Sequence, residues 1–185
     1  VLRHLAEIRL ASLRARDLVK QILTFARRQD QTVSRMRIGP IARGCIKMLS
    51  ATIPSSVRIE QEIQEDHLVV RANPIQIQQV ILNLLSNAKD ATIEKKKLAT
   101  NGYVPQVMLE TLKKQNSVIL KISDNGIGIS GENQKKVFLP FFTTKSLGKG
   151  QGLGLSIATR IIHEFEGQIE LYSDSNTGTT FIIEI

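Results

Sequence analysis

Two pairs of alternating segments constrain the fold of this 185-residue chain more than any other feature. In each pair a short polar turn separates two runs of alternating apolar and polar residues, and the runs are residues 106–113 with 117–123 and residues 167–173 with 179–185. Such alternation is typical of half-buried strands, and short turns join antiparallel neighbours. Helical patterns do not alternate regularly with single strands, so we expect an α/β sandwich of the α+β type, with a mixed, largely antiparallel sheet and helices on one face.

The stretch between residues 38 and 165 supplies the expected helices and two further strands. Asn73 and Pro74 predict an N-cap followed by a proline at the first helical position, before a strongly helical stretch that reaches Ala91. We expect residues 94–105 to form a loop, with the lysines at 95–97 as a solvated helix end. The other expected elements are a helix from near Pro40 to about Ala51, strands at 57–63 and 67–71, a short helix at 132–137 and a helix at 153–165.

The N-terminal segment, residues 1–30, lacks Gly and Pro and carries apolar residues at heptad spacing. This spacing predicts a long amphipathic helix that needs a partner helix, so we expect residues 1–32 to be a dimerisation helix, 33–37 a linker and 38–185 a second domain. Residues 1–37 hold nine Arg or Lys and three Asp or Glu, so they carry +6 of the net charge of +8. Without interleaved aromatic residues or a nucleic-acid motif, we interpret this charge as a solvated helix face and expect no nucleic-acid partner.

Composition excludes several classes of protein. The single cysteine, Cys45, rules out an internal disulfide framework, and its apolar helical surroundings predict a buried residue. One cysteine and three scattered histidines give no plausible zinc site. No apolar run reaches about 18 residues, and no signal segment opens the chain. We therefore expect a soluble, cytoplasmic chain, and we leave open whether a longer parent protein is anchored in a membrane.

A first polar cluster interrupts the helix in 79-QVILNLLSNAKDA-91. Asn83, Asn87 and Asp90 lie at i, i+4 and i+7, so they share one stripe of the helix. Amide oxygens on this stripe suit either structural hydrogen bonds or a hard cation such as Mg²⁺, which works alongside substrate phosphates.

Two glycine-rich clusters follow. In 124-DNGIGI-129, Asp124 ends a strand beside glycines that let a flat ligand approach the backbone, and its carboxylate suits an amino-bearing base, although Asp-Asn-Gly is also an ordinary turn sequence. In 148-GKGQGLGL-155, four glycines precede a helix whose N-terminus favours anions. The second cluster lacks the Lys-Ser/Thr of a P-loop and the βαβ unit of a dinucleotide fold.

In their order and spacing, these clusters resemble the ATP-binding core of sensor histidine kinases, within the wider GHKL family of ATPases and kinases. The quoted motifs are similar to the N box (NLLSNAKDA), the G1 box (DNGIGI), the F box (FLPFFTTK, 138–145), the G2 box (GQGLGLSIA, 150–158) and the last glycine motif (GTTF, 178–181). The resemblance covers about residues 36–185 and implies a Bergerat fold that binds ATP with Mg²⁺ over 38–185. Residues 15–29 are more loosely similar to the second helix of the dimerisation domain.

The resemblance also implies roles for individual residues. Asn87 would ligate Mg²⁺, Asp124 would bind the adenine amino group, and Lys145 would contact phosphate. The glycines at 126 and 128 would shape the adenine pocket, and the backbone N–H groups that wrap the phosphates would be those of Gly150, Gly152, Leu153 and Gly154. The expected ligand-binding set also contains Asn83, Asp90, Gly126, Gly128, Ile129, Leu155 and Thr179, and Thr179 is equally well explained as an ordinary strand threonine. The phenylalanines 138, 141 and 142 would pack within the segment that covers the nucleotide.

Two positions depart from the family pattern. ATP-hydrolysing relatives carry a Glu one turn before the N-box asparagine as the general base, whereas this chain has Asn83, whose amide cannot take a proton. Transfer to a protein acceptor is therefore favoured over hydrolysis. A phosphoacceptor box, a His followed by an acidic residue, is missing from this sequence, and we expect none of His4, His67 and His163 to be the acceptor.

These features favour the ATP-binding catalytic core of a two-component sensor histidine kinase. It would transfer the γ-phosphoryl group of ATP to a histidine on a missing phosphoacceptor helix, and thence to the receiver domain of a response regulator. Residues 1–30 would form a homodimer. Two alternatives stay open: a GHKL-type conformational ATPase, and a non-catalytic module that binds a partner through the basic helix.

Overall fold

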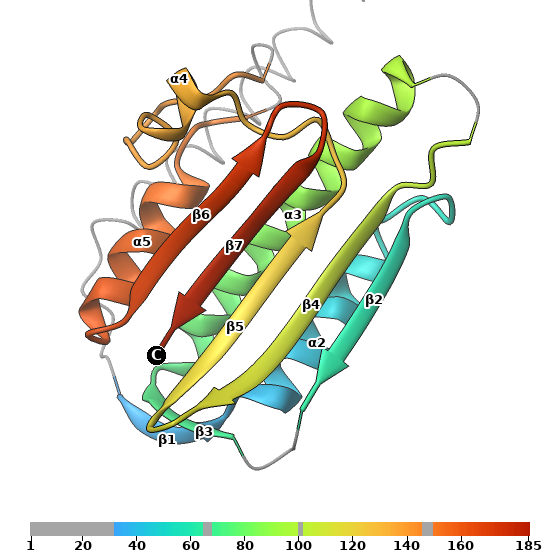
Figure 1. The fold of residues 1–185 in the computed structure, drawn as a ribbon. Helices are drawn as coiled ribbons and strands as arrows, with labels where there is room; N and C mark the ends of the chain where they lie inside the picture. Colours follow the sequence, from blue (N-terminus) through green and yellow to red (C-terminus); the bar gives the residue numbers. More distant parts are fainter. Residues whose placement is uncertain (1–31, 65–67, 100–101, 146–149) are drawn as a thin grey trace, which may run out of the picture.

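Figure 1 shows the computed structural model of the chain, which describes residues 32–64, 68–99, 102–145 and 150–185. Its elements in chain order are β1 (Ser34–Arg37), α2 (Ile38–Ser50), β2 (Arg58–Ile63), β3 (Val69–Ala72), α3 (Pro74–Leu98), β4 (Gln106–Lys114), β5 (Ser117–Asp124), α4 (Gly131–Gln134), α5 (Gly154–Glu164), β6 (Gln168–Asp174) and β7 (Gly178–Glu184). The expected dimerisation helix, His4, His67 and Gly148 lie outside the described residues.

The main sheet has five strands in the order β2-β4-β5-β7-β6. The pairs β4–β5, β5–β7 and β6–β7 are antiparallel, and β2–β4 is parallel. This confirms the predicted mixed, largely antiparallel sheet. The two hairpins expected from the alternating segments are β4–β5 and β6–β7. The register of β5 with β7 places Asp124 opposite Thr179, so two candidate site residues from distant parts of the sequence are neighbours.

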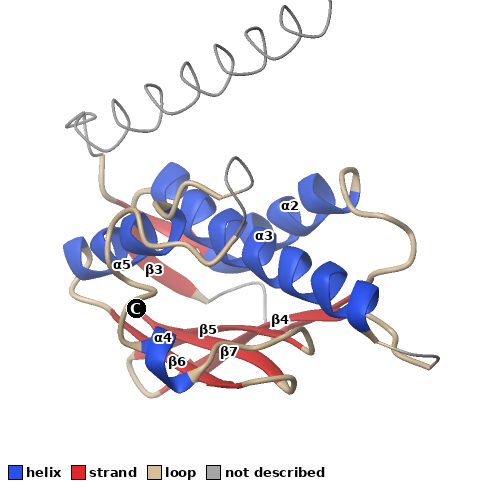
Figure 2. Cartoon of the chain, turned by 90° about the horizontal axis from the view of Figure 1, so that it is seen from above, coloured by secondary structure: helices blue, strands red, loops and turns tan. Residues whose placement is uncertain are grey.

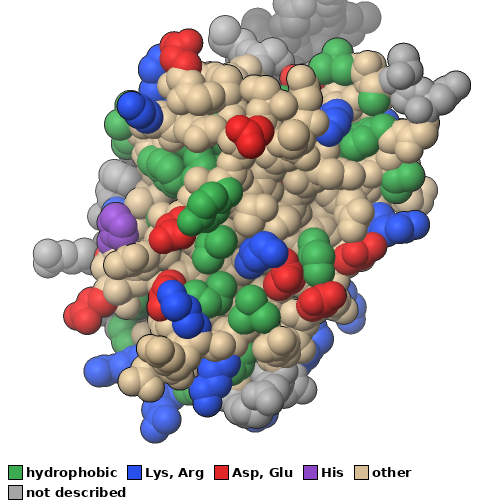
Figure 3. All heavy atoms as spheres, in the orientation of Figure 1, with side chains coloured by type: hydrophobic (Ala, Val, Ile, Leu, Met, Phe, Trp, Pro, Cys, Tyr) green, Lys and Arg blue, Asp and Glu red, His purple; other side chains and the backbone are tan. Residues whose placement is uncertain are grey.

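The helices α2, α3 and α5 lie over one face of the sheet, as Figure 2 shows. The central helix α3 packs against both α2 and α5, and its predicted apolar stripe is buried, with Ile77, Val80, Ile81, Leu84 and Leu85 fully inaccessible to solvent. Each such side chain contributes roughly 1.5–3 kcal/mol by leaving water. The other face of the sheet carries charged side chains of both signs, including the ion pairs Lys121–Glu110 and Lys114–Glu184 (Figure 3).

The start of α3 has the predicted cap, but its end lies later than expected. The Asn73 Oδ1 atom accepts hydrogen bonds from the backbone N–H groups of Ile75 (2.9 Å) and Gln76 (3.2 Å). The helix continues to Leu98, so the beginning of the expected loop at 94–105 is helical. The interpretation of all three lysines at 95–97 as a solvated end is also wrong for Lys95, whose ammonium donates to two backbone carbonyls.

The expected linker at 33–37 contains a strand. β1 pairs with β3 in a separate two-stranded antiparallel sheet, in which Met36 lies opposite Val70 and both side chains are buried. Four residues with one buried side chain give little alternation, and the partner strand lies more than thirty residues along the chain. The sequence pattern therefore carries no local signal for this strand.

Cys45 lies in α2 with 1% of its surface exposed, which confirms the predicted burial. Burial raises the pKa of its thiol to about 11, so the reactive thiolate is scarcely populated at neutral pH. None of the described helices combines the length and the apolar character that a membrane crossing needs.

Candidate nucleotide-binding site

A cavity of about 680 Å³ opens between α3, the loop after β5, the segment after α4 and the start of α5. A cavity of this size is in the usual range for small-molecule sites. It brings together almost all of the expected ligand-binding residues: Asn83, Asn87, Asp90, Asp124, Gly128, Ile129, Lys145, Gly150, Gly152, Leu153, Gly154, Leu155 and Thr179. Gly126 is buried in the same loop but is not among the lining residues.

One end of the cavity is built around the carboxyl group of Asp124. The Asp124 Oδ1 atom accepts a hydrogen bond of 2.7 Å from the backbone N–H of Gly126. Burial raises the pKa of this carboxyl to about 6, against the opposing effects of backbone hydrogen bonds from Gly126 and Thr179 and of the positive charge of Lys95. Asp124 is therefore ionised at neutral pH but close to titration, and when ionised it is a hydrogen-bond acceptor.

The loop that follows Asp124 is tightly held. Gly128 has φ +69°, and a Cβ atom there would run into the carbonyl oxygen of Asp174, the last residue of β6. The backbone N–H of Ile129 donates to Ser173 Oγ (2.8 Å). Ser173 Oγ also lies 3.0 Å from Thr179 Oγ1. Thr179 is buried and lines the cavity, but its hydroxyl already has a partner in the sheet, so both explanations offered for it from the sequence stay open.

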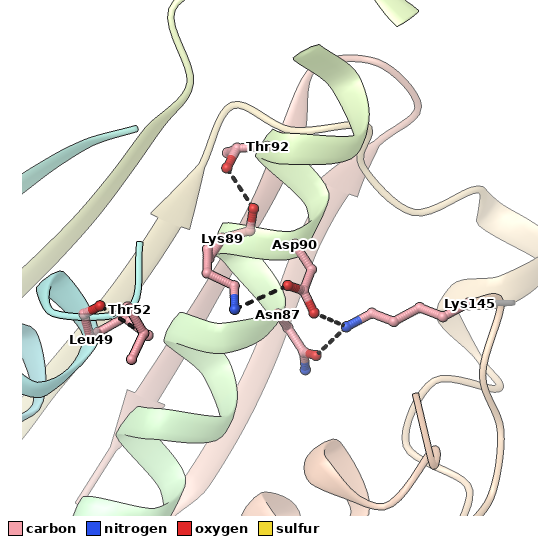
Figure 4. Close-up of polar contacts among 7 residues, drawn as sticks. All are labelled: Leu49, Thr52, Asn87, Lys89, Asp90, Thr92 and Lys145. Atoms are coloured by element: carbon pink, nitrogen blue, oxygen red, sulfur yellow. Dashed lines mark hydrogen bonds and ion pairs between the residues drawn. The ribbon is translucent and has the colours of Figure 1, made fainter. Parts of the chain in front are cut away.

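The other end of the cavity holds a cluster of charged and amide groups (Figure 4). The ammonium Nζ of Lys145 lies 2.6 Å from Asp90 Oδ2 and 3.3 Å from Asn87 Oδ1. Lys89 Nζ lies 3.3 Å from Asp90 Oδ1. The predicted shared stripe of Asn87 and Asp90 is thus present on α3, and it meets Lys145 across the cavity.

Asn83 has a different kind of contact. Its side-chain N–H donates to the carbonyl oxygen of Gly154 (3.1 Å), the first residue of α5. The amide therefore ties α3 to the start of α5 while it lines the cavity. The first N–H groups of a helix have no partner within the helix, and its dipole favours negative charge there. Because Leu153, Gly154 and Leu155 also line the cavity, this helix start is suited to hold phosphate oxygens.

The segment between α4 and α5 closes back on itself near the cavity. The backbone N–H of Phe141 donates to the carbonyl of Gly152 (2.9 Å). Gly152 has φ +68°, and a Cβ atom there would lie 2.6 Å from the carbonyl oxygen of Phe142. Only glycine fits without strain at this close approach.

The three phenylalanines of this segment differ from one another. Phe138 is half-buried and makes an edge-to-face contact with Phe181, with ring centroids 6.5 Å apart, as the packing interpretation requires. Phe142 lines the cavity. The packing interpretation is wrong for Phe141, a residue that is 64% exposed.

Several residues that hold the site were missed in the sequence. Lys95 and Tyr103 contact the loop that carries Asp124, and Gln134 Nε2 donates to the carbonyls of Ile129 (3.0 Å) and Ser173 (2.6 Å). Most of these bonds are made to backbone atoms far along the chain, and no residue pattern marks such acceptors. Asn125 also holds the loop, through side-chain hydrogen bonds to the backbone of Val104 and Gln106. It belongs to the Asp-Asn-Gly turn sequence, so this role could have been predicted from the sequence.

The described residues supply only some of the oxygen ligands that a hard cation takes. No three His, Cys, Asp or Glu side chains among these residues come together as a metal cluster. The oxygens that α3 offers to a cation beside Lys145 are the amide oxygen of Asn87 and the carboxylate of Asp90. This set fits Mg²⁺, which is usually bound through one or two protein oxygens together with substrate phosphates and water.

Comparison with known proteins was consistent with this geometry. Residues 72–185, more than half of the chain, match the family described as histidine kinase-, DNA gyrase B-, and HSP90-like ATPase. The chain belongs to this family. Within it, the chain is 32% identical over 176 residues to the sensor kinase CckA of Brucella abortus (strain 2308), an alignment that covers 92% of this chain and 19% of the relative.

Within this wide family, the solved structures that match the chain are histidine kinases. The catalytic domain of the histidine kinase ThkA matches with a TM-score of 0.69 and 29% identity, over 83% of this chain and 94% of that one. ThkA in complex with the response regulator protein TrrA matches with a TM-score of 0.74 and 25% identity, over 95% of this chain and 48% of that one. The chain therefore has the fold of a histidine kinase catalytic domain, and it spans about a fifth of the length of the curated relatives it matches.

Proposed function

We propose that the chain is the ATP-binding catalytic core of a sensor histidine kinase, which passes the γ-phosphoryl group of ATP to a histidine on another helix. The observation that carries this proposal is the order of polar groups along the cavity of about 680 Å³. A hydrogen-bond acceptor, Asp124, lies at one end, and Lys145 with the start of α5 supplies positive potential at the other. An adenine nucleotide has the matching order of groups, an amino-bearing base at one end and phosphates at the other.

The residues of this chain would mainly position the nucleotide. The carboxylate of Asp124 accepts from the adenine amino group, the start of α5 holds phosphate oxygens, and Lys145 balances their charge. Asn87, with Asp90 beside it, would hold Mg²⁺, which when bound neutralises negative charge on the phosphates. Phosphoryl transfer depends largely on such positioning and electrostatic stabilisation. The P–O bond to the γ-phosphorus breaks to leave ADP, and a P–N bond to the acceptor imidazole forms with loss of the imidazole proton.

Transfer is favoured over hydrolysis by the group at position 83. Asn83 donates its amide hydrogen to Gly154 and has no proton-accepting carboxylate to activate water. The acceptor histidine would lie on a phosphoacceptor helix outside this chain, with residues 1–30 as the adjoining helix of a homodimer. The receiver domain of a response regulator would take the phosphoryl group next. The ThkA–TrrA complex supports a partner of this kind.

The test is incubation of the chain with γ-labelled ATP and Mg²⁺, with and without an added phosphoacceptor helix. We expect acid-labile label on the added helix, none on a matched helix in which the acceptor His is replaced by Gln, and little release of free phosphate. Steady ATP turnover at the rate of dedicated ATPases would favour the conformational ATPase instead. Label on His4 of the chain alone would overturn the assignment of the N-terminal segment.

Nucleotide binding can be tested separately from transfer. A ligand that binds only the native state raises the melting temperature by mass action. We expect ATP with Mg²⁺ to raise the melting temperature of the chain, and failure to do so would favour the non-catalytic module.

A further inference from the structure

The ammonium of Lys95 joins three segments that are far apart in the sequence. It extends from the last turns of α3 and donates to the carbonyl oxygen of Asn125 (2.9 Å) and to that of Asn176 (2.6 Å). Asn125 follows Asp124, and Asn176 lies in the turn between β6 and β7. The same turn is bound to the Asp124 loop a second time, because the backbone N–H of Asn176 donates to the carbonyl of Ile127 (2.6 Å).

Tyr103 contacts the same loop. Its hydroxyl lies 3.1 Å from the carbonyl oxygen of Asn125 and 2.9 Å from Asn125 Oδ1. The Lys95 ammonium lies 5.1 Å from the centre of the Tyr103 ring, within the range of a cation–π contact. Asn125 Oδ1 also accepts from the backbone N–H of Gln106 (2.9 Å), and Asn125 Nδ2 donates to the carbonyl of Val104 (2.9 Å).

These contacts leave the loop after β5 little freedom. The carbonyl of Asn125 receives hydrogen bonds from both Lys95 and Tyr103, and the backbone N–H of Ile127 donates to the carbonyl of Ala91 on α3 (3.3 Å). We propose that Lys95 and Tyr103 are positioning residues that fix the loop at 124–128 and its carboxylate for an adenine base, and so set the preference of the cavity for adenine over guanine nucleotides. This inference rests on the proposed ATP binding.

The chemistry of the two bases explains the preference. Adenine presents an amino group, which donates to a carboxylate, whereas guanine presents a carbonyl oxygen at the corresponding position. An ionised carboxylate in a fixed position accepts from the amino group and repels the carbonyl oxygen. A loop that can shift, or a carboxyl that is protonated, loses part of this discrimination.

The charges of Lys95 and Asp124 also favour the protonation states that adenine binding needs. The positive charge of Lys95 lowers the pKa of Asp124 against the larger effect of burial. Burial, and after it the negative charge of Asp124, raises the pKa of Tyr103 to about 12. The hydroxyl of Tyr103 therefore keeps its proton and remains a donor. The other titratable side chains that line the cavity are Asp90 and Glu94 on α3 and Lys145 on the segment opposite.

The test compares ATP and GTP binding to the whole chain by calorimetry between pH 5 and pH 8. In Lys95→Met we expect the dissociation constant of ATP to rise roughly tenfold, as when a partner behind a ligand-binding group is lost in metal sites. The dissociation constant of GTP should change little in this variant, so the preference for ATP over GTP falls. The pH at which ATP binding is half lost should rise by about one unit, because an opposite charge near Asp124 has gone.

Matched variants decide between positioning and simple loss of structure. Lys96→Met removes an exposed lysine from the next position of α3 and should bind ATP as the wild type does. If Lys95 only stabilised the fold, its loss would weaken ATP and GTP equally and leave the pH midpoint in place, which would overturn the proposal. Should Lys95→Met not fold, Tyr103→Phe keeps the ring and removes only the hydroxyl, and an unchanged ATP/GTP ratio in that variant would overturn the proposal as well. Wild-type chain that binds no ATP would instead refute the proposed function itself.

Discussion

The ammonium of Lys145 lies 2.6 Å from the carboxylate of Asp90, and this ion pair spans the cavity between the segment after α4 and helix α3. Both side chains keep about a third of their surface exposed, so the pair contributes at most about 1 kcal/mol to stability. Such a weak contact can be exchanged for a stronger one with a phosphate group. Without Lys145, Lys89 is the cation among the described residues that still pairs with the carboxylate of Asp90.

Replacement of Lys145 by Met should weaken ATP binding about tenfold, because a cation is removed and the charge of Asp90 is left to repel the phosphates. The double variant Lys145→Met with Asp90→Asn should recover part of this loss. Calorimetry measures the ATP affinity of the single and the double variant. The control is Lys136→Met, which removes a partly exposed lysine that pairs with Glu132 rather than with a group of the cavity. A double variant that binds ATP no better than Lys145→Met would show that the charge of Asp90 does not act on the phosphates.

Replacement of Asn87 by Ala should abolish the dependence of ATP binding on Mg²⁺ while the fold persists. The amide oxygen is the oxygen that α3 offers at the phosphate end beside Asp90, and Mg²⁺ needs oxygen ligands. The measurement is ATP affinity in Mg²⁺ and in chelator, with the melting temperature as the check of folding. Asn116→Ala, in the exposed turn between β4 and β5, is the matched control. Equal dependence on Mg²⁺ in Asn87→Ala and wild type would remove Asn87 from the metal site.

The sequence predicted the main sheet and most of the helices because their patterns are local. Alternation marks β4 to β7, and the Asn73–Pro74 pair marks the start of α3 at the residue where the structure places it. β1 and the last turns of α3 were missed for a shared physical reason. Both are stabilised by partners distant in the chain, β3 for Met36 and the carbonyls of Asn125 and Asn176 for Lys95.

The residues of the candidate site likewise fall into a group that the sequence predicts and a group that it does not. Side chains whose type is dictated by a ligand, such as Asp124 and Asn87, could be found from motifs, and the cavity brings them together. Residues that hold those side chains in place act on backbone atoms and have no pattern of their own. The pairing of Lys145 with Asp90 is of this second kind, since either residue alone has several possible partners.

Replacement of Asp124 by Asn should stabilise the chain in the absence of nucleotide, and the gain should depend on pH. Burial raises the pKa of Asp124 from 3.8 to about 6, so its contribution to stability is fully present below the unfolded pKa and is lost as the pH rises through about 6. Above that pH, the buried charge costs up to about 3 kcal/mol, which Asn does not incur. Urea denaturation of both proteins should show this advantage at pH 8 and roughly half of it at pH 5. An advantage that does not change between these two pH values would contradict the assignment.

Replacement of Gly152 by Ala should lower stability by about 1–3 kcal/mol, because a residue with a side chain is strained at positive φ and the Cβ atom meets the backbone of residues 141 and 142. ATP affinity should fall with it, since the same backbone lines the cavity. Thermal unfolding and ATP titration check the two effects. Gly131→Ala is the control, because the structure has open space for its side chain and the backbone there is not in the left-handed region. If both alanine variants melted like the wild type, the close approach at Gly152 would not constrain the chain.

The long helix α3 carries contacts to both ends of the cavity, from Asn83 at the start of α5 to Lys95 at the loop after β5. With a rise of about 1.5 Å per residue, the twelve steps from residue 83 to residue 95 fix a separation of roughly 18 Å along the helix axis. One inserted or deleted residue would change that length by a single step, but it would also turn every later side chain by about 100° around the axis. Between these two positions of this chain, a change of residue type leaves the two contacts in register, whereas a change in the number of residues does not.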